Sequence, residues 1–321
     1  MIVVTGAAGF IGSAVIWGLN LRKEHDILAV DTIDDPQKKL NLAPLKYTGT
    51  VEKDAFRDQL CTGKYKGLRA IFHLGAISST TENNWELLND VNVQYSKDII
   101  EYCVQKNIRI IYASSAAVYG DGSSGYTDSE QMFEALQPLN LYGRSKLLVD
   151  TWARDKGFLK RAVGLRYFNV FGPNEYHKGT MQSVIAKSFP LAYERGEIRL
   201  FKSYNPAYAH GEQKRDFVYI KDVVRATLFF LDHSAQSGIF NIGTGVARSW
   251  NDVAHALFSA LNKKGTITYV DMPEALRGQY QYFTEANISK LRAAGCNDSF
   301  ETLEDSITNY VQDYLLGNHH L

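Results

Sequence analysis

The chain has 321 residues, with 35 basic and 35 acidic side chains, so its formal net charge at pH 7 is zero. Balanced charge argues against nucleic acid or an anionic membrane as a partner, and no apolar run approaches the roughly 18 residues of a membrane-spanning helix. The three cysteines, Cys61, Cys103 and Cys296, are too scattered for a disulfide framework or a metal site, so we expect reduced thiols, no metal and a cytoplasmic protein.

The first element is an apolar stretch, Ile2–Thr5, which predicts a strand and leads into Gly6, Gly9 and Gly12. A helical pattern follows directly. Glycines between a strand and a helix permit a tight turn and let backbone N–H groups approach a pyrophosphate. The next apolar run ends at Asp31, about 20 residues further on, where a ribose-binding carboxylate is expected. This arrangement predicts a dinucleotide site, the alternative being a glycine turn without a ligand.

The first half of the chain alternates strand-like and helix-like stretches. Apolar runs predict strands at Ile2–Thr5, Ile27–Asp31, Leu68–His73, Ile108–Ala113 and Ala162–Tyr167. Helical patterns lie at 13–22, 85–105 and 141–155. This βαβ alternation predicts an α/β fold with a doubly wound parallel sheet of the Rossmann type.

After about residue 170 the pattern becomes irregular, with helices predicted at 182–197, 250–262 and 302–316. We expect a smaller α/β substrate domain there. The segment 215–232 is apolar enough to return to the main sheet, so the two domains interleave in sequence. The prediction is a dinucleotide-binding domain of residues 1–168 plus 216–246 and a substrate-binding domain of residues 169–215 plus 247–321.

Three side chains indicate proton transfer. Tyr142 and Lys146 are four residues apart on a predicted helix and share a face. A free tyrosine has a pKa of about 10, and a neighbouring ammonium group lowers that pKa. Ser115 ends the fourth predicted strand, and the loop after such a strand faces the ligand crevice. Alone, these residues also fit a solvated helix face and a backbone cap; combined with the glycine loop, they predict an active site.

Several segments resemble the extended short-chain dehydrogenases/reductases, the NAD-dependent epimerase/dehydratase family that acts on nucleotide sugars. They are the segments 166–173, 215–219 and 240–245. Within this family the chain is most similar to the ADP-L-glycero-D-manno-heptose 6-epimerases, on the segments 78–82, 177–181, 277–284 and 291–295. The resemblance runs from residue 1 to about residue 316.

The resemblance implies an isomerase that inverts C6 of ADP-D-glycero-D-manno-heptose. A hydride leaves C6 for the nicotinamide, the resulting ketone rotates, and the hydride returns to its other face. Because the substrate oxygen then occupies two places, the family uses two acid/base groups, and Tyr142 and Lys178 stand at the matching positions. Without the resemblance, Lys178 would be a phosphate clamp or a loop lysine. The family also implies lipopolysaccharide inner-core synthesis, a cytoplasmic location and a homo-oligomer.

The motifs and the resemblance together assign residues to the two ligands. Cofactor contacts are expected from Gly6, Gly9, Phe10, Ile11, Gly12, Asp31, Thr32, Lys38, Lys53, Leu74, Gly75, Ala76, Asn92, Tyr142, Lys146, Val170 and Lys178. Substrate contacts are expected from Ser78, Ser79, Ser115, Asn169, Thr180, Lys187, Phe201, Arg215 and Tyr280, with Arg215 on the diphosphate. Asp31 favours a free ribose hydroxyl, whereas Lys38 and Lys53 match lysines that the family places near the adenosine. We expect NADP, with NAD as the alternative.

Other functions stay open at this point. A UDP-hexose 4-epimerase on the same fold would have no obvious need for Lys178. A dehydratase usually carries Asp-Glu after the strand-end hydroxyl, where this chain has Ala116 and Ala117, which argues against elimination. A cofactor-sensing protein without catalysis would not need the serine, tyrosine and lysine. The segment 201–213 is longer than the family pattern.

Overall fold

The computed structural model describes residues 1–33, 35–60, 62–278 and 280–321. Cys61, expected as a reduced thiol, and Gln279, within the segment 277–284, lie outside the described residues, as does Asp34. Within the described chain, no helix combines the length and the apolar character needed to cross a bilayer.

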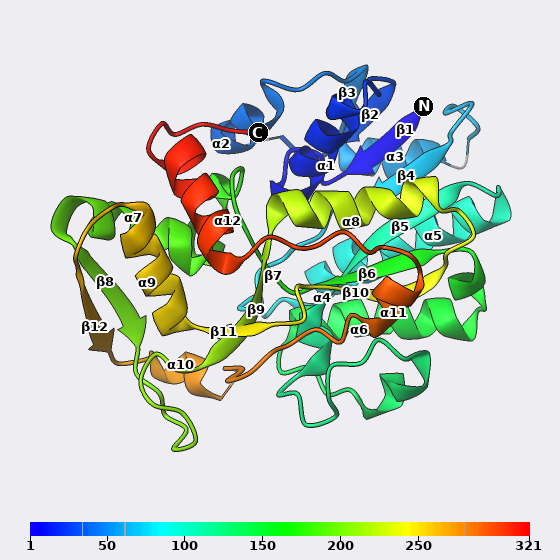
Figure 1. Ribbon diagram of the computed structural model, residues 1–321. Coiled ribbons are helices and arrows are strands. Elements are labelled where there is room, and N and C mark those ends of the chain that lie inside the picture. Colours follow the sequence, from blue (N-terminus) through cyan, green and yellow to red (C-terminus); the bar gives the residue numbers. More distant parts are fainter. Residues whose placement is uncertain (34, 61, 279) are drawn as a thin grey trace.

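The centre of the molecule is a seven-stranded parallel sheet in the order β10-β6-β5-β4-β1-β2-β3 (Figure 1). Its strands are β1 (Ile2–Thr5), β2 (Ile27–Val30), β3 (Gly49–Val51), β4 (Ala70–His73), β5 (Arg109–Ser115), β6 (Val163–Tyr167) and β10 (Gly238–Ile242). The strand order reverses between β1 and β4, which makes the sheet doubly wound. The predicted fold class is therefore confirmed.

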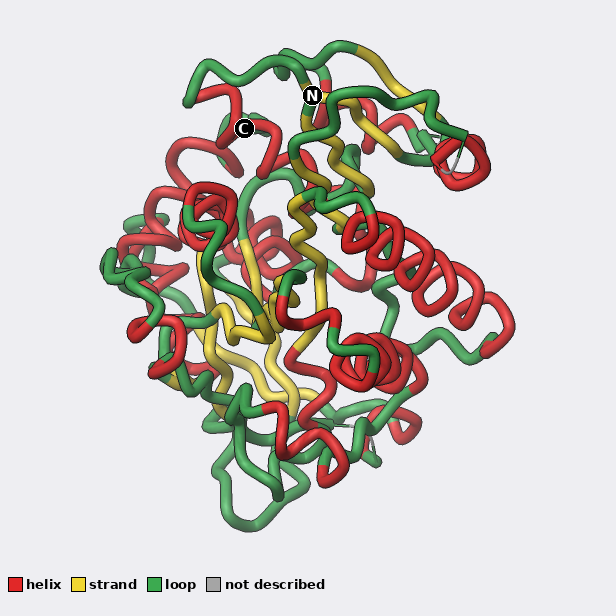
Figure 2. The backbone as a smooth tube through the Cα atoms, turned by 90° about the vertical axis from the view of Figure 1, so that its right-hand side faces the viewer, coloured by secondary structure: helices red, strands yellow, loops and turns green. Residues whose placement is uncertain are grey.

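Helices cover both faces of this sheet, because the strands bury side chains on both sides. Val3 belongs to one core cluster and its neighbours Ile2 and Val4 to the other. The first face carries α3 (Lys53–Leu60), α5 (Tyr95–Gln105) and α6 (Leu141–Asp155), and the second carries α1 (Phe10–Leu21) and α8 (Ile220–Asp232). Figure 2 shows the strands running through the middle of the molecule with helices on both sides.

The shorter helices of this part lie around the sheet edges and loops. They are α2 (Pro36–Leu42), α4 (Trp85–Leu88), the π-helical η1 (Asn89–Gln94) and the 3₁₀ segments η2 (Ala116–Tyr119), η3 (Glu130–Ala135) and η4 (Phe158–Lys160). The predicted helix 85–105 is confirmed as α4, η1 and α5 in succession. Its π turn contains Asn92.

A smaller body contains two further sheets. The first is three-stranded, with β7 (Asn169–Phe171), β9 (Lys214–Tyr219) and β11 (Ala247–Ser249), and the second pairs β8 (Glu197–Phe201) with β12 (Thr266–Val270). The helices of this region are η5 (Tyr176–Met181), α7 (Val184–Arg195), α9 (Trp250–Ala260), α10 (Glu274–Arg277), α12 (Leu303–Asn309) and η6 (Tyr310–Leu315). The short helix α11 (Ser289–Ala293) packs on β10 of the main sheet instead.

The predicted return of the segment 215–232 to the main sheet is wrong for its strand and correct for its helix. β9 pairs with β7 and β11, whereas α8 packs on β5 and β6. The strand that rejoins the main sheet is β10, which pairs with β6. The apolar character of 215–219 reflects burial between the two bodies, which a linear pattern does not distinguish from a place in the main sheet. The exact division of the chain into two domains stays a prediction.

Candidate active site

A cavity of about 1130 Å³ lies at the carboxyl ends of the main-sheet strands. Its walls come from the loops after β1, β4 and β5, from β7 and η5, and from α7 and β8 of the smaller body. All residues predicted for the site line this cavity except Asn92 and Arg215. The structure therefore brings together segments that are up to about 270 residues apart, from Gly6 to Tyr280.

The glycine loop is packed too closely for side chains at two positions. Gly6 has a φ of +65°, and a Cβ atom there would lie 2.6 Å from the Cα of Gly75. A Cβ at Gly12 would lie 2.0 Å from the carbonyl oxygen of Gly6. The helix α1 starts after Gly9 with no side-chain cap and no acidic residue in its first turn. Its free N–H groups can therefore hold an anion, which fits the pyrophosphate of a dinucleotide.

Asp31 and Lys38 line the cavity where a ribose is expected to bind beside this loop. The Oδ2 atom of Asp31 accepts a hydrogen bond from the backbone N–H of Ala8 at 2.9 Å. The Nζ atom of Lys38 lies 3.5 Å from Oδ1 of Asp31. Lys53 also lines the cavity, while its Nζ atom is 2.6 Å from Asp54. This end thus offers a carboxylate for a ribose hydroxyl and two ammonium groups for a phosphate.

Tyr142 and Lys146 lie on the first turns of α6, whose start is fixed by the Asn140 side chain accepting from the N–H of Gly143 at 2.8 Å. Burial raises the pKa of Tyr142, and a hydrogen bond with Ser115 acts in the opposite direction. The Nζ atom of Lys146 donates to the carbonyl oxygen of Ala113 at 2.9 Å, and a lowering of the Tyr142 pKa by Lys146 stays a prediction. Burial lowers the pKa of Lys146 itself to about 8.

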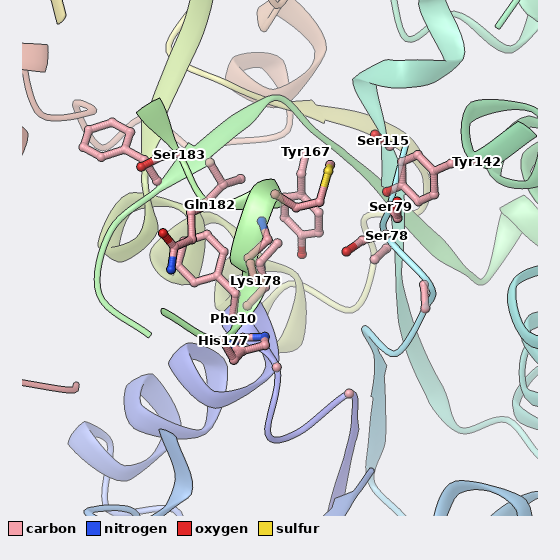
Figure 3. Close-up of a pocket in the computed structure, with 18 of the residues that line it drawn as sticks. Phe10, Ser78, Ser79, Ser115, Tyr142, Tyr167, His177, Lys178, Gln182 and Ser183 are labelled. Atoms are coloured by element: carbon pink, nitrogen blue, oxygen red, sulfur yellow. The ribbon is translucent and has the colours of Figure 1, made fainter. Parts of the chain in front are cut away.

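Lys178 projects into the cavity from η5 of the smaller body. Figure 3 shows Tyr142 beside Ser115 on one side of the cavity and Lys178 on the opposite side, near Phe10. Burial lowers the pKa of Lys178, and the positive charge of Lys187 adds to this, while Glu175 opposes it. A lysine with a lowered pKa holds a neutral amine at a pH where a free lysine does not, as a general base requires.

The charges around the cavity are strongly unequal although the whole chain is neutral. Among the lining residues that the structure describes, five are lysines, one is an arginine and a single one, Asp31, is acidic. Such an excess of positive charge suits a cofactor and a substrate that each carry a diphosphate. The serines at the end of β5 and in the loop after β4 supply neutral hydroxyl groups beside Tyr142.

Asn92 and Arg215 do not line the cavity, but each contacts a residue that does. The side chain of Asn92 is buried and holds Ile77 by two hydrogen bonds, accepting from its N–H at 2.8 Å and donating to its carbonyl oxygen at 2.9 Å. Arg215 donates to the carbonyl oxygens of Lys214 and Gln281. Its guanidinium also faces the ring of Tyr280 at 5.0 Å. Direct ligand contacts by these two residues stay predictions.

Some lining residues were not expected from the sequence. His177, Gln182, Arg199 and Trp250 line the cavity but were not assigned to a ligand. His177 lies in the segment 177–181 and in the same short helix as Lys178, and Gln182 follows the last residue of that helix, so their nearness to Lys178 is the signal that could have found them. Arg199 and Trp250 come from separate elements, and their arrival at the cavity depends on how the smaller body packs.

Comparison with known proteins gives a consistent result along the whole chain. A sequence model of the NAD dependent epimerase/dehydratase family matches residues 2–243. The chain is 47% identical over 316 residues to an ADP-L-glycero-D-manno-heptose-6-epimerase of Nitratidesulfovibrio vulgaris, covering 98% of each chain. It is 45% identical over 325 residues to the Fusobacterium nucleatum protein of that name, again covering 98% of each.

Solved structures agree with these sequence matches. The Helicobacter pylori ADP-L-glycero-D-manno-heptose-6-epimerase superimposes with a TM-score of 0.81 at 29% identity, over 97% of this chain and 95% of that one. The Thermus thermophilus UDP-glucose 4-epimerase, solved in complex with NAD, shares the fold with a TM-score of 0.78 at 23% identity, over 98% and 99% of the two chains. The chain therefore belongs to the NAD dependent epimerase/dehydratase family and, within it, to the group of ADP-L-glycero-D-manno-heptose-6-epimerases.

Proposed function

We propose that this protein converts ADP-D-glycero-D-manno-heptose to ADP-L-glycero-D-manno-heptose by inverting C6. The observation that carries the proposal is the placement of two proton-transfer side chains, Tyr142 and Lys178, on opposite sides of one cavity beside the glycine loop. The names of the relatives support the choice of substrate. A 4-epimerase is not favoured, because it leaves Lys178 without a role.

The nicotinamide cofactor, held by the glycine loop and by Asp31 and Lys38, supplies a site that accepts a hydride from C6 and returns it. The chain's own residues handle the protons. Tyr142, which lies beside Ser115, takes the C6 hydroxyl proton of one epimer and returns it when that epimer is formed. Lys178 does the same for the other epimer from the opposite wall. Between the two transfers the substrate is a 6-ketone, whose rotation exchanges the face presented and moves its oxygen from one proton donor to the other.

The other charged and polar side chains of the cavity orient the substrate. Ser78, Ser79 and Asn169 lie where they can bind sugar hydroxyls, and Thr180 and Lys187 lie further along the wall of the cavity. We assign Lys187 and Arg199 to the diphosphate, and the assignment is supported by their positive charge and by their place in the cavity wall. Phe201 and Tyr280 provide apolar surface for the nucleoside end.

We further propose NADP as the cofactor, because Lys38 and Lys53 both line the cavity together with Asp31 and because Lys38 lies 3.5 Å from the Asp31 carboxylate and offsets its charge. A cytoplasmic homo-oligomer that serves lipopolysaccharide inner-core synthesis is the setting that this activity implies.

The decisive experiment is incubation of the purified protein with ADP-D-glycero-D-manno-heptose, followed by chromatographic separation of the two C6 epimers. We expect a mixture of both epimers at equilibrium, approached from either side, with no net consumption of cofactor. The matched control is a UDP-hexose under the same conditions, which we expect to remain unchanged. Conversion of the UDP-hexose alone would overturn the proposal in favour of a 4-epimerase.

A further inference from the structure

The last three residues of the chain contact the segment that precedes Lys178. Leu321 is 6% exposed, and its N–H donates to Oδ1 of Asn174 at 2.9 Å. The carbonyl oxygen of His319 accepts from the hydroxyl of Tyr176 at 2.9 Å. The ring of His320 stands edge-on to that of Tyr176, with 5.1 Å between the ring centres. In Figure 1 this end of the chain lies beside α2.

His320 binds a buried asparagine that connects it to both halves of the site. Its Nδ1 atom is 2.8 Å from Oδ1 of Asn41. The amide nitrogen of Asn41 donates to the carbonyl oxygens of Ala8 and Asn174, each at 3.0 Å. Because those two partners can only accept, the amide oxygen faces His320, and Nδ1 of His320 must be the donor. Ala8 belongs to the glycine loop, so one side chain joins that loop to the end of the chain.

The same asparagine reaches the residue next to Lys178. Its amide nitrogen lies 3.3 Å from Nδ1 of His177, which lines the cavity. Asn174, four residues before Lys178, has a φ of +76° and is itself tied to Ser13 of α1 by a 2.9 Å hydrogen bond. The hydrogen bonds of Asn41 and Asn174 therefore attach the segment 174–178 to the cofactor side of the cavity.

We propose that residues 319–321 hold the segment 174–178 against the glycine loop. In this arrangement His320 is a positioning residue for proton transfer by Lys178. The inference rests on the proposed function in so far as it concerns Lys178. Loss of the bond from His320 leaves the amide oxygen of a buried asparagine without a donor, and the freed amide can turn away from Ala8 and His177. Lys178 then spends less time at the position from which it reaches the substrate oxygen.

The chain offers a matched pair for the test, because two histidines are adjacent. His320→Ala removes the bond to Asn41, whereas His319→Ala removes only a contact with the carbonyl oxygen of Asp313 in the same terminal segment. His320→Asn keeps a donor near the place of Nδ1 and serves as the rescue variant. We expect His320→Ala to lower kcat about ten-fold with little change in KM. His319→Ala and His320→Asn should stay close to the unsubstituted protein.

Two further readouts separate positioning from general stability. In single turnovers followed by the absorbance of reduced nicotinamide, His320→Ala should slow cofactor reduction by one C6 epimer, the one that Lys178 serves, and not by the other. Hydrogen exchange of the ligand-free protein should become faster in the peptide that covers 172–183 and unchanged in the strands of the main sheet. Equal slowing with both epimers, or exchange that rises throughout the chain, would overturn the proposal. The exchange experiment remains decisive even if the protein fails to epimerise the heptose, so the two proposals can fail separately.

Discussion

The Nζ atom of Lys178 lies 5.1 Å from the centre of the Phe10 ring. This contact places an ammonium group of the smaller body over the first residue of α1, at the point where the helix N-terminus faces the cavity. The aromatic face favours the charged lysine, while burial favours the neutral amine and lowers its pKa. The two effects act in opposite directions on the protonation of this side chain, whose proposed role is both to take and to return a proton.

Replacement of either proton-transfer residue should abolish most epimerisation without loss of cofactor. Tyr142→Phe and Lys178→Met keep the size of the side chains and remove the transferable proton, and general acid–base catalysis of this kind contributes about 10²–10⁴-fold. The measurement is the rate of interconversion of the two epimers, together with the cofactor released on denaturation. Near-full activity of Lys178→Met would show that one acid/base group suffices and that the second has another role.

Cofactor choice should depend on Lys38 and not on its neighbour Lys39. Lys38 lines the cavity 3.5 Å from Asp31, whereas Lys39 is exposed on the same helix and is absent from the cavity wall. We expect Lys38→Ala to weaken NADP binding about ten-fold more than NAD binding, since a charge-assisted hydrogen bond contributes roughly 1.5–3 kcal/mol. Titration of ligand-free protein with both cofactors measures this. Equal weakening of both, or the same effect in Lys39→Ala, would contradict a 2′-phosphate contact by Lys38.

Much of the fold could be predicted because buried parallel strands and glycine turns leave local patterns. The runs at β1, β2 and β4 are short, mostly apolar and wholly buried, and Gly6 and Gly12 are dictated by contacts of the loop with itself and with Gly75. The helix α6 was predicted with its observed bounds, and it starts at an asparagine cap.

The parts that could not be predicted depend on packing between distant segments. β9 is as buried as a main-sheet strand from Arg215 to Tyr219, yet it pairs with β7 and β11. Lys178 entered the predicted site only through family resemblance, because a lysine in a loop carries no local sign that Phe10 and Glu175 will surround it. The contacts of Asn41 with Ala8 and His320 join positions near both ends of the chain, and no spacing rule anticipates them.

Arg215 provides a test of direct against indirect action on the substrate. Its guanidinium is buried, donates to the carbonyl oxygens of Lys214 and Gln281, and faces Tyr280, which lines the cavity. Arg215→Met keeps the volume but leaves these carbonyls unpaired, at about 1–3 kcal/mol of stability. We expect a lower unfolding midpoint together with a several-fold higher KM, and no change in either for Lys214→Met on the exposed face of β9. A higher KM with an unchanged midpoint would instead support a direct diphosphate contact.

His73 should make the protein less stable in mild acid. Its ring is 2% exposed at the end of β4, between Thr5 at 2.8 Å and Ser96 at 2.9 Å. Ser96 donates its own proton to the carbonyl oxygen of Asn92 at 2.6 Å, so Nε2 of His73 must be the donor to Ser96 and Nδ1 the acceptor from Thr5. A second proton on the ring would have no acceptor without reorientation of Thr5, whose hydroxyl oxygen also accepts from Gly75 at 3.1 Å.

Burial, reinforced by the charge of Lys146, lowers the pKa of His73 from 6.5 to about 3. In this pH range the ring of His73 is protonated in the unfolded chain but stays neutral in the folded chain. The free energy of unfolding therefore falls as the pH drops from 6.5 toward 3. Between pH values of about 7.5 and 5.5 this one group should remove about 1.4 kcal/mol from the free energy of unfolding. Urea unfolding at both pH values measures the change. The control is His73→Asn, which has no titrating group at this position and retains His177 and the other histidines, so that its pH dependence gives their contribution. Between the two pH values, the free energy of unfolding should change less in the variant than in the unsubstituted protein, by that amount. Equal changes would show that the folded chain protonates His73 as readily as the unfolded chain does.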